Sequence, residues 1–489
     1  MPATLAGFAE DIERRRQDWH VPGCAVAVIE EGEVIFSRGF GSCREGEATP
    51  ITPKTLFPIA SATKPFTAHS LAILVEKGIL NWDTPLQQYW PEFRLFDPVA
   101  SNRLTVRDLL CHRSGLSRHD LLWYQSPLSR LELMERLRYL EPSKDFRSAY
   151  QYQNLMYAAA GYLVERLTGL PWETFVREKI LLPLGMNNSC FSLREAGEKG
   201  MLAHPYMRNG ERVTEVPFLN NEAIGPAGSM IATLEDMCKW LRFQLQPDNS
   251  LTNAGESIMS AYMQEELRAP QIAVGPYPAT YPEVMLSSAA LGWFVQAYRG
   301  ERMVYHAGNL QGFSSLISFL PDKKCGVVVL SQVDNSRLPM IVTHEAYDRV
   351  LGLLPVDWHG KLRSEDEKEA NERQARYREL QEMKTSLGLH ETSILPEKTS
   401  NQGCVGMYRH AGYGQISVTE VEGIMHANYN SLSFLLEPIG ENRYLATYDE
   451  TYILCMPMTF QTDSSGEVVS LSAPFEPVTG AKEIMFSRI

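Results

Sequence analysis

Hydrophobic positions repeat with two different periods along the chain, and the change of period divides the sequence into regions. Residues 4–18 place apolar side chains at helical spacing among polar ones, so this segment is predicted to form an amphipathic helix. Two stretches rich in Val, Ile and Phe follow at 24–29 and 34–40, with a Glu-Glu-Gly turn between them. Such a pair is typical of an antiparallel hairpin.

The middle of the chain, from about residue 60 to 245, has mostly helical spacing interrupted by loops rich in Pro and Gly. Helices are predicted at 71–77, 155–168, 172–180 and 234–245. The strand period then returns at 291–298, 302–306, 314–319 and 326–331, and a helix is predicted at about 338–353. Strands at both ends with helices between them predict one mainly antiparallel sheet flanked by an inserted helical region.

The last quarter of the chain has a different character. Residues 359–385 are densely charged with few apolar positions, which is typical of a solvated helical linker. From 403 to 489, apolar and polar residues alternate between turn signals, which predicts about eight short strands in a small β-barrel or sandwich. We therefore expect a mixed α and β domain at 1–357, a linker at 358–390 and an all-β domain at 391–489.

Charge and hydropathy narrow the range of partners. The chain has 489 residues and a formal net charge of -13, which repels phosphate backbones and anionic lipid surfaces. Its apolar stretches are far shorter than the roughly 20 residues of a membrane-spanning helix. Residues 1–16 lack the apolar core of a secretory signal. We expect a cytoplasmic protein that binds neither nucleic acid nor membranes, and the sequence leaves open whether it forms a homo-oligomer.

Motif searches remove several classes of enzyme. The eight cysteines form no Cys-x-x-Cys pair and have no histidine companion at zinc-ligand spacing, so we interpret them as buried, reduced thiols. Phosphate-binding and dinucleotide-binding glycine motifs are absent, as is the Gly-x-Ser-x-Gly elbow of α/β-hydrolases. We expect no metal and no cofactor.

One tetrapeptide, Ser61-Ala-Thr-Lys64, carries candidate chemistry. Ser61 and Lys64 are three residues apart where a loop enters a predicted helix, so both side chains lie on one helical face. A serine at this position is a candidate nucleophile, and a buried lysine can take its proton. The alternative is a helix N-cap beside a surface lysine.

Two further groups of residues are candidates for the same site. Tyr152 and Asn154 precede a predicted helix and can present a phenol and an amide, or else be a packed Tyr beside an Asn N-cap, with Tyr150 as a rival. His306-Ala-Gly308-Asn309 ends a predicted strand, where Gly308 allows the backbone to approach a substrate closely. The N–H groups of Ser61 and Asn309 would form an oxyanion hole, with His306 at the edge of the cleft.

Taken together, the motifs resemble the serine β-lactamases and penicillin-binding-protein-like hydrolases. The elements that carry this resemblance, over roughly residues 5–355, are Phe57-Pro-Ile-Ala-Ser61-Ala-Thr-Lys64, Leu109-Leu-Cys-His112-Arg-Ser-Gly115, Tyr152-Gln-Asn154, Gly225-Pro-Ala-Gly228-Ser, Leu291-Gly-Trp-Phe and His306-Ala-Gly308. The resemblance implies a five-stranded antiparallel sheet with a helical region. It also implies an acyl-enzyme on Ser61, proton transfer by Lys64 and Tyr152, substrate binding by Asn154, and an oxyanion hole from Ser61 and Asn309. His69 and His112 are interpreted as structural.

The third motif departs from the β-lactamases, which have Lys-Thr-Gly where this chain has His306-Ala-Gly308. A histidine near its reference pKa of about 6.5 is mostly neutral at pH 7, so a fixed cation for a substrate carboxylate is missing. The His-x-Gly form is similar to D-aminopeptidases and D-amino-acid amidases of this family. Members of that subgroup carry a lipocalin-like barrel, which either selects free peptide ends or serves as a stability or oligomer module.

The resulting hypothesis is a serine hydrolase that acts on amide bonds of small peptides, with a D-residue at the recognised position. Three alternatives stay open: a carboxylesterase with the same residues, a peptide cyclase or acyltransferase, and a non-catalytic ligand sensor. Retention of Ser61, Lys64 and Tyr152 together disfavours the sensor, because a binding module has no use for the base.

Overall fold

Contacts between Cα atoms divide the chain into two compact units. The computed structural model describes residues 3–210, 212–246, 258–275, 280–386, 403–448, 455–476, 478 and 480–489. The first unit comprises Met1–Phe93, Val99–Gly115 and Phe146–Leu362, and the second comprises Arg94–Pro98, Leu116–Asp145 and Arg363–Ile489. The second unit therefore includes a segment from the middle of the chain, which the hydrophobic pattern did not separate from its surroundings.

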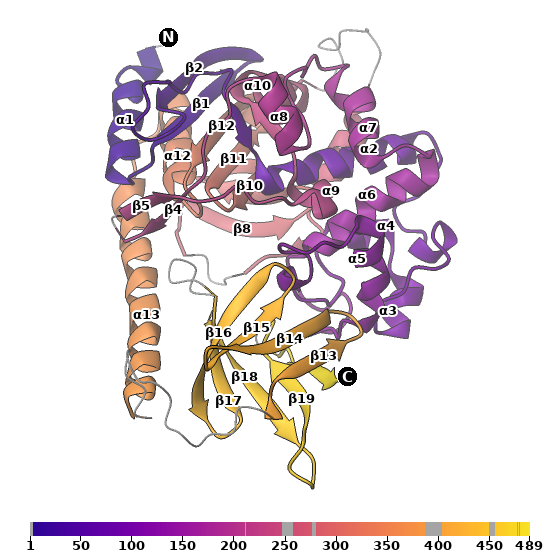
Figure 1. Cartoon of the computed structure of the whole chain (residues 1–489). Coiled ribbons are helices and arrows are strands. Elements are labelled where there is room, and N and C mark those ends of the chain that lie inside the picture. Colours follow the sequence, from indigo (N-terminus) through magenta and orange to yellow (C-terminus); the bar gives the residue numbers. More distant parts are fainter. Residues whose placement is uncertain are drawn as a thin grey trace. The chain divides into compact units, whose positions relative to one another are not determined.

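Within the described residues, the first unit is built on an antiparallel sheet of eight strands in the order β2-β1-β12-β11-β10-β9-β8-β7 (Figure 1). The strands are β1 (Gly23–Glu30), β2 (Glu33–Gly41), β7 (Ile272–Ala273), β8 (Val284–Ala289), β9 (Phe294–Tyr298), β10 (Glu301–Leu310), β11 (Phe313–Leu320) and β12 (Cys325–Gln332). Six of them, all except β7 and β8, were predicted from the strand period. The expected five-strand count is wrong because β9, β8 and β7 continue the ladder beyond β10, pairing backbone groups that an edge strand leaves open.

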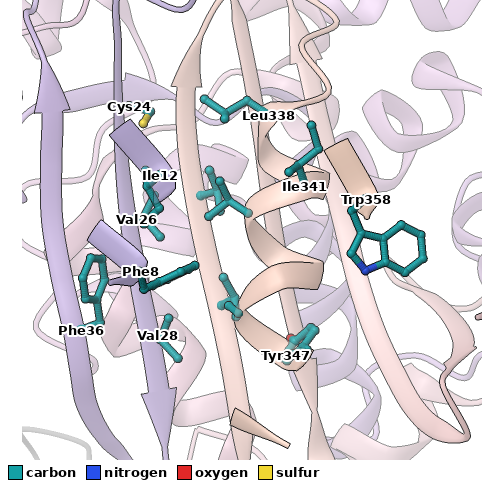
Figure 2. Packing of buried hydrophobic residues seen from close by; sticks show 14 of the residues in the cluster. Phe8, Ile12, Cys24, Val26, Val28, Phe36, Leu338, Ile341, Tyr347 and Trp358 are labelled. Atoms are coloured by element: carbon teal, nitrogen blue, oxygen red, sulfur yellow. The ribbon is translucent and has the colours of Figure 1, made fainter. Parts of the chain in front are cut away.

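The core of the first unit lies between one face of this sheet and helices α1 (Phe8–Asp18) and α12 (Leu338–Val350). Figure 2 shows Phe8 of α1 and Ile341 of α12 in one apolar cluster with Val26 and Val28 of β1. The intervening Ala25 and Ala27 of β1 are buried as well, and α10 (Leu234–Leu245) contacts β1 and β12. Burial of β1 on both faces explains why residues 24–29 read as a nearly continuous apolar run.

The inserted helical region contains α2 (Lys64–Glu76), α6 (Asn154–Thr168) and α9 (Gly225–Gly228), which contact one another. Further helices along the chain are α3 (Pro98–Arg103), α4 (Val106–Leu110), α5 (Arg130–Arg136), α7 (Trp172–Val176), α8 (Leu193–Lys199) and α11 (Ala261–Arg268). The predicted helices at 155–168 and 234–245 are confirmed as α6 and α10. Helix α2 begins seven residues before its predicted start at 71, because it is buried on all sides from Lys64 to Leu74 and shows no amphipathic period there.

Two short antiparallel pairs complete the strands of the first unit. One joins β3 (Leu56–Pro58) to β6 (Ile231–Thr233), and the other joins β4 (Tyr206–Asn209) to β5 (Arg212–Glu215). Strand β3 lies directly before Ser61 in the sequence, so its pairing with β6 anchors the chain where it enters the nucleophile turn.

The described residues of the second unit form a closed antiparallel barrel of eight strands, β13 to β20, coloured orange to yellow in Figure 1. The strands are β13 (Gly406–His410), β14 (Gly414–Val421), β15 (Ile424–Tyr429), β16 (Leu432–Gly440), β17 (Arg443–Thr447), β18 (Cys455–Thr462), β19 (Val468–Ala473) and β20 (Ile484–Arg488). Pairing of β13 with β20 closes the barrel, which decides between the predicted barrel and the sandwich.

Helix α13 (Trp358–Ser386) occupies the predicted charged linker as far as the structure describes it. Trp358 and Leu362 are buried in the core of the first unit, so the first turn of α13 belongs to that unit. The predicted boundaries at 357/358 and 390/391 stay predictions, and the second lies outside the described residues. In the described part of the chain, no helix has the combination of length and apolar character that crossing a bilayer requires.

Candidate active site

Ser61 lies in a tight 3-10 turn, Ala60–Thr63, immediately before α2. Ala60 has a φ of +49°, a left-handed conformation that costs a residue with a Cβ about 1 kcal/mol. The backbone therefore carries strain at the residue before the candidate nucleophile, which is where active sites often store it. The Ser61 side chain is half-buried.

Lys64, the first residue of α2, is completely buried. Its Nζ donates to Ser61 Oγ at 3.0 Å, to Asn154 Oδ1 at 2.9 Å and to the backbone oxygen of Ala227 at 2.8 Å. Three acceptors use the three donor directions of an ammonium group, so the side chain is held in one orientation. The surface-lysine alternative is therefore wrong.

The second motif lies beside Lys64. Lys64 Nζ is 4.7 Å from the centre of the Tyr152 ring. Gln153, and not Asn154, is the N-cap of α6, because the Gln153 side chain accepts a hydrogen bond from the N–H of Leu155. This leaves Asn154 in the first turn with its amide oxygen on Lys64. The rival Tyr150 packs against the rings of His112 and Phe294.

The third motif brings the β10 backbone against the nucleophile turn. A Cβ on Gly308 would lie 2.2 Å from the backbone oxygen of Ile59 and 3.1 Å from the backbone nitrogen of Ser61, so only glycine permits this approach. Ser315, opposite Gly308 on β11, donates through Oγ to the same Ile59 oxygen at 2.8 Å. The Asn309 side chain is exposed and accepts a hydrogen bond from Ser314 Oγ at 2.9 Å.

His306 is 2% exposed, and its predicted position at the edge of the cleft stays a prediction. The ring is covered by Phe294, at 5.3 Å between centroids, and its Nδ1 lies 2.7 Å from the backbone oxygen of Ala307. Burial, with a smaller contribution from the charge of Lys64, lowers the pKa of His306 to about 3. The imidazole is therefore neutral at pH 7, with Nδ1 as the donor to Ala307.

Sequence reasoning missed three contributors to the site. The Ala227 carbonyl holds Lys64, and its segment is tied to α2 because Thr67 Oγ1 donates to the oxygen of Pro226 at 2.6 Å. His112 stacks on Tyr152, and Ser315 holds Ile59. A backbone carbonyl leaves no signal in the sequence, whereas His112 and the 225–229 segment were visible as parts of the motif series. Among the described side chains, no group of three or more His, Cys, Asp or Glu is placed to hold a metal ion.

The class of β-lactamase-like proteins is defined by two features that this chain has. One is an antiparallel sheet with inserted helices, and the other is a Ser-x-x-Lys turn that lies against the strand carrying the third motif. The β-lactamase family model matches residues 8–349. The chain therefore belongs to the β-lactamase family, as the resemblance of its motifs implied.

Curated relatives and solved structures agree with this assignment. The chain is 34% identical over 343 residues to a protein named unguisins hydrolase ungD' from Aspergillus campestris, an alignment covering 67% of this chain and 61% of the relative. It is 24% identical over 341 residues to protein flp of Staphylococcus aureus, which covers 68% of this chain and 64% of the relative. The chain thus matches less than two thirds of the length of these relatives.

Among solved structures, an octameric penicillin-binding protein homologue from Pyrococcus abyssi aligns with a TM-score of 0.61 and 22% identity, covering 99% of this chain and all of the other. A D-amino acid amidase from Ochrobactrum anthropi aligns with a TM-score of 0.58 and 23% identity, covering 72% of this chain and 98% of the other. At these identities the likeness shows the fold, and the first alignment extends through the C-terminal barrel.

Proposed function

We propose that this chain is a serine hydrolase that forms a covalent ester on Ser61 and cleaves or transfers amide bonds of small peptides with a D-residue at the recognised position. The observation that carries the proposal is the buried contact of 3.0 Å between Lys64 Nζ and Ser61 Oγ. In its neutral amine form, Lys64 at this distance can take the hydroxyl proton as the oxygen attacks. Relatives named as an unguisins hydrolase and as D-amino acid amidases support an amide substrate.

The proposed reaction assigns one task to each residue. Ser61 Oγ attacks the substrate carbonyl carbon while its proton passes to Lys64, and Tyr152 helps return a proton to the leaving amine. The N–H groups of Ser61 and Asn309 stabilise the oxyanion, and Asn154, whose Oδ1 orients Lys64, binds a substrate amide through its NH2 group. Water or an amine then attacks the ester carbonyl, the ester bond breaks, and Ser61 recovers its proton.

The neutral state of His306 supports peptides and amides over β-lactams. With a pKa lowered to about 3, His306 gives a substrate carboxylate no positive charge at pH 7. A fixed lysine at the same place, as in the β-lactamases, would attract that carboxylate. Substrates that present an amide or another neutral group at this place lose no binding energy when a neutral histidine replaces the lysine.

The test compares steady-state rates on matched D- and L-aminoacyl anilides and one simple ester, for wild type and Ser61→Ala. We expect a D-selective amidase rate that Ser61→Ala lowers by roughly four orders of magnitude or more, because the nucleophile is lost. Mass spectrometry of the wild type, quenched during turnover, should find the acyl group on Ser61.

Ser70→Ala is the matched control, because Ser70 lies on the same helix with its Oγ bonded to the backbone oxygen of Phe66. It should keep its turnover. Retained turnover in Ser61→Ala overturns the proposal, and ester turnover without amide turnover replaces the amidase with an esterase.

A further inference from the structure

His112 contacts three consecutive residues of the second motif. Its ring stacks on the ring of Tyr152, with centroids 4.4 Å apart and planes inclined by 27°. Its Nδ1 accepts a hydrogen bond from the N–H of Gln153 at 3.0 Å, and its carbonyl oxygen accepts one from the N–H of Gln151 at 2.8 Å. His112, 2% exposed, thus contacts Tyr152 with its ring and holds the backbone on both sides of it, through Nδ1 at Gln153 and through its own backbone carbonyl at Gln151.

The turn that carries His112 is itself fixed. Arg113 and Arg147 both bind the buried carboxylate of Asp108, at 2.5 Å and 2.6 Å. Burial raises the pKa of Asp108, but the hydrogen bonds from Arg147, Arg113 and Thr105 outweigh it and leave the pKa below its usual value, so the clamp is ionic at neutral pH. The N–H of Arg147 also donates to the carbonyl of Arg113 at 2.9 Å. The segment that carries His112 is therefore joined to the segment that leads into Tyr152.

The backbone of His112 is strained in a way that restricts what can replace it. Its φ is +60°, in the left-handed region, where Asn is tolerated far better than aromatic residues. Because Nδ1 accepts the Gln153 N–H, the proton of the neutral ring sits on Nε2. The ring therefore offers two separable features: a flat face for Tyr152 and an acceptor for Gln153.

We propose that His112 is a positioning residue that keeps the Tyr152 phenol beside Lys64; this rests on the proposed function, in which the two groups share proton transfer. Lys64 is fixed by Asn154 and Ala227. His112 helps to fix the other member of the pair, because it stacks on the Tyr152 ring and binds the N–H of Gln153. A shift of about 1 Å in the Tyr152 phenol lowers the rate about 100-fold, although His112 itself touches no substrate.

The test uses two substitutions that separate the two features. His112→Phe keeps an aromatic face but loses the acceptor and resists the positive φ, whereas His112→Asn keeps an acceptor and tolerates that φ but loses the face. We expect kcat per active site to fall roughly 100-fold in His112→Phe and about 10-fold in His112→Asn, with KM within about threefold of wild type. His344→Phe, the same exchange at a buried histidine of α12, is the control and should keep kcat.

A second readout does not depend on turnover. In protein labelled with 13C at the Tyr ζ carbon, the Tyr152 signal is the one that Tyr152→Phe removes. We expect this signal to move in both His112 variants and to stay in place in His344→Phe. If the wild type turns over no substrate, the proposed function fails while this signal still tests His112. An unmoved Tyr152 signal, or a kcat loss no larger than that of His344→Phe, overturns the positioning role.

Discussion

At the scale of single residues, the site depends on how closely two backbones approach each other. Gly308 of β10 lies against Ile59 and Ser61, and the Ile59 carbonyl is held from the other side by Ser315. Since an oxyanion hole works through donors aimed in advance, a displacement of the Ser61 N–H by a few tenths of an ångström is felt in the rate. The absence of one Cβ is therefore part of the proposed chemistry.

Gly308→Ala should lower kcat/KM by roughly 100-fold or more, the scale of losing one oxyanion donor. The new Cβ would meet backbone at 2.2 Å, which a flexible side chain cannot relieve. Rates on the anilide substrates measure the effect, with circular dichroism to verify folding. Gly300→Ala in the turn before β10 is the control: its Cβ meets no atom within 4 Å although its φ is +91°, so it should lose stability but little activity. Equal losses of activity in the two variants would contradict the close-approach argument.

At the scale of elements, α12 shows how burial of one polar ring makes the packing of a helix depend on pH. His344 is 3% exposed and stacks on Tyr298 and Trp358, with centroids 4.7 Å and 4.3 Å away. Burial lowers the pKa of His344 to about 3. Within the described residues its Nδ1 has no hydrogen-bond partner, so nothing compensates an added proton.

His344→Phe should reduce the sensitivity of the fold to acid. In the unfolded chain a histidine titrates near 6.5, so between pH 6.5 and about 3 the unfolded state binds a proton that the folded state does not. The free energy of unfolding therefore falls as the pH falls, by about 1.4 kcal/mol per pH unit for this group. Urea unfolding of wild type and variant between pH 7 and 4 measures the difference between their free energies of unfolding. The contributions of the other buried histidines cancel in this difference. Parallel curves would show that His344 titrates normally.

At the scale of the whole molecule, the unit that contains the barrel is not formed by the C-terminal part of the chain alone. The second unit combines the barrel with Leu116–Asp145, which leaves and re-enters the first unit at the residues flanking His112 and Tyr152. Inside the second unit, His119 Nδ1 lies 2.7 Å from the Tyr413 hydroxyl, and Arg136 donates to the backbone oxygen of Gly412 at 2.8 Å. Burial lowers the pKa of His119 to about 4, so this contact is made by a neutral imidazole at pH 7.

A double-mutant cycle of Tyr413→Phe and His119→Asn should reveal coupling between the barrel and the 116–145 segment. Asn is chosen because His119 has a φ of +49°. Each substitution is expected to lower the free energy of unfolding by about 1–3 kcal/mol, since it leaves a buried polar group without this partner. The sum should exceed the double mutant's loss by about 1 kcal/mol. Urea denaturation measures all four proteins, and additive effects would show that the two residues do not interact.

The sequence by itself determined the local elements and the identity of the motif residues. The strand period located β1, β2, β9 to β12 and the number of barrel strands, because alternation reports directly which side chains are buried. The spacing of Ser61 and Lys64 placed both on one helical face, because three residues make nearly one turn. Each of these inferences needs only the conformation of a short segment.

Only the tertiary structure decided which distant groups meet. The Ala227 carbonyl on Lys64, His112 on Tyr152, the burial of His306 and the insertion of 116–145 into the barrel unit all join residues far apart in the chain. The start of α2 was missed because a helix buried on every side has no polar face to reveal its period. The physical reason is common to all of them: periodicity records that a side chain leaves water, but the partner it meets is chosen by packing across the whole fold.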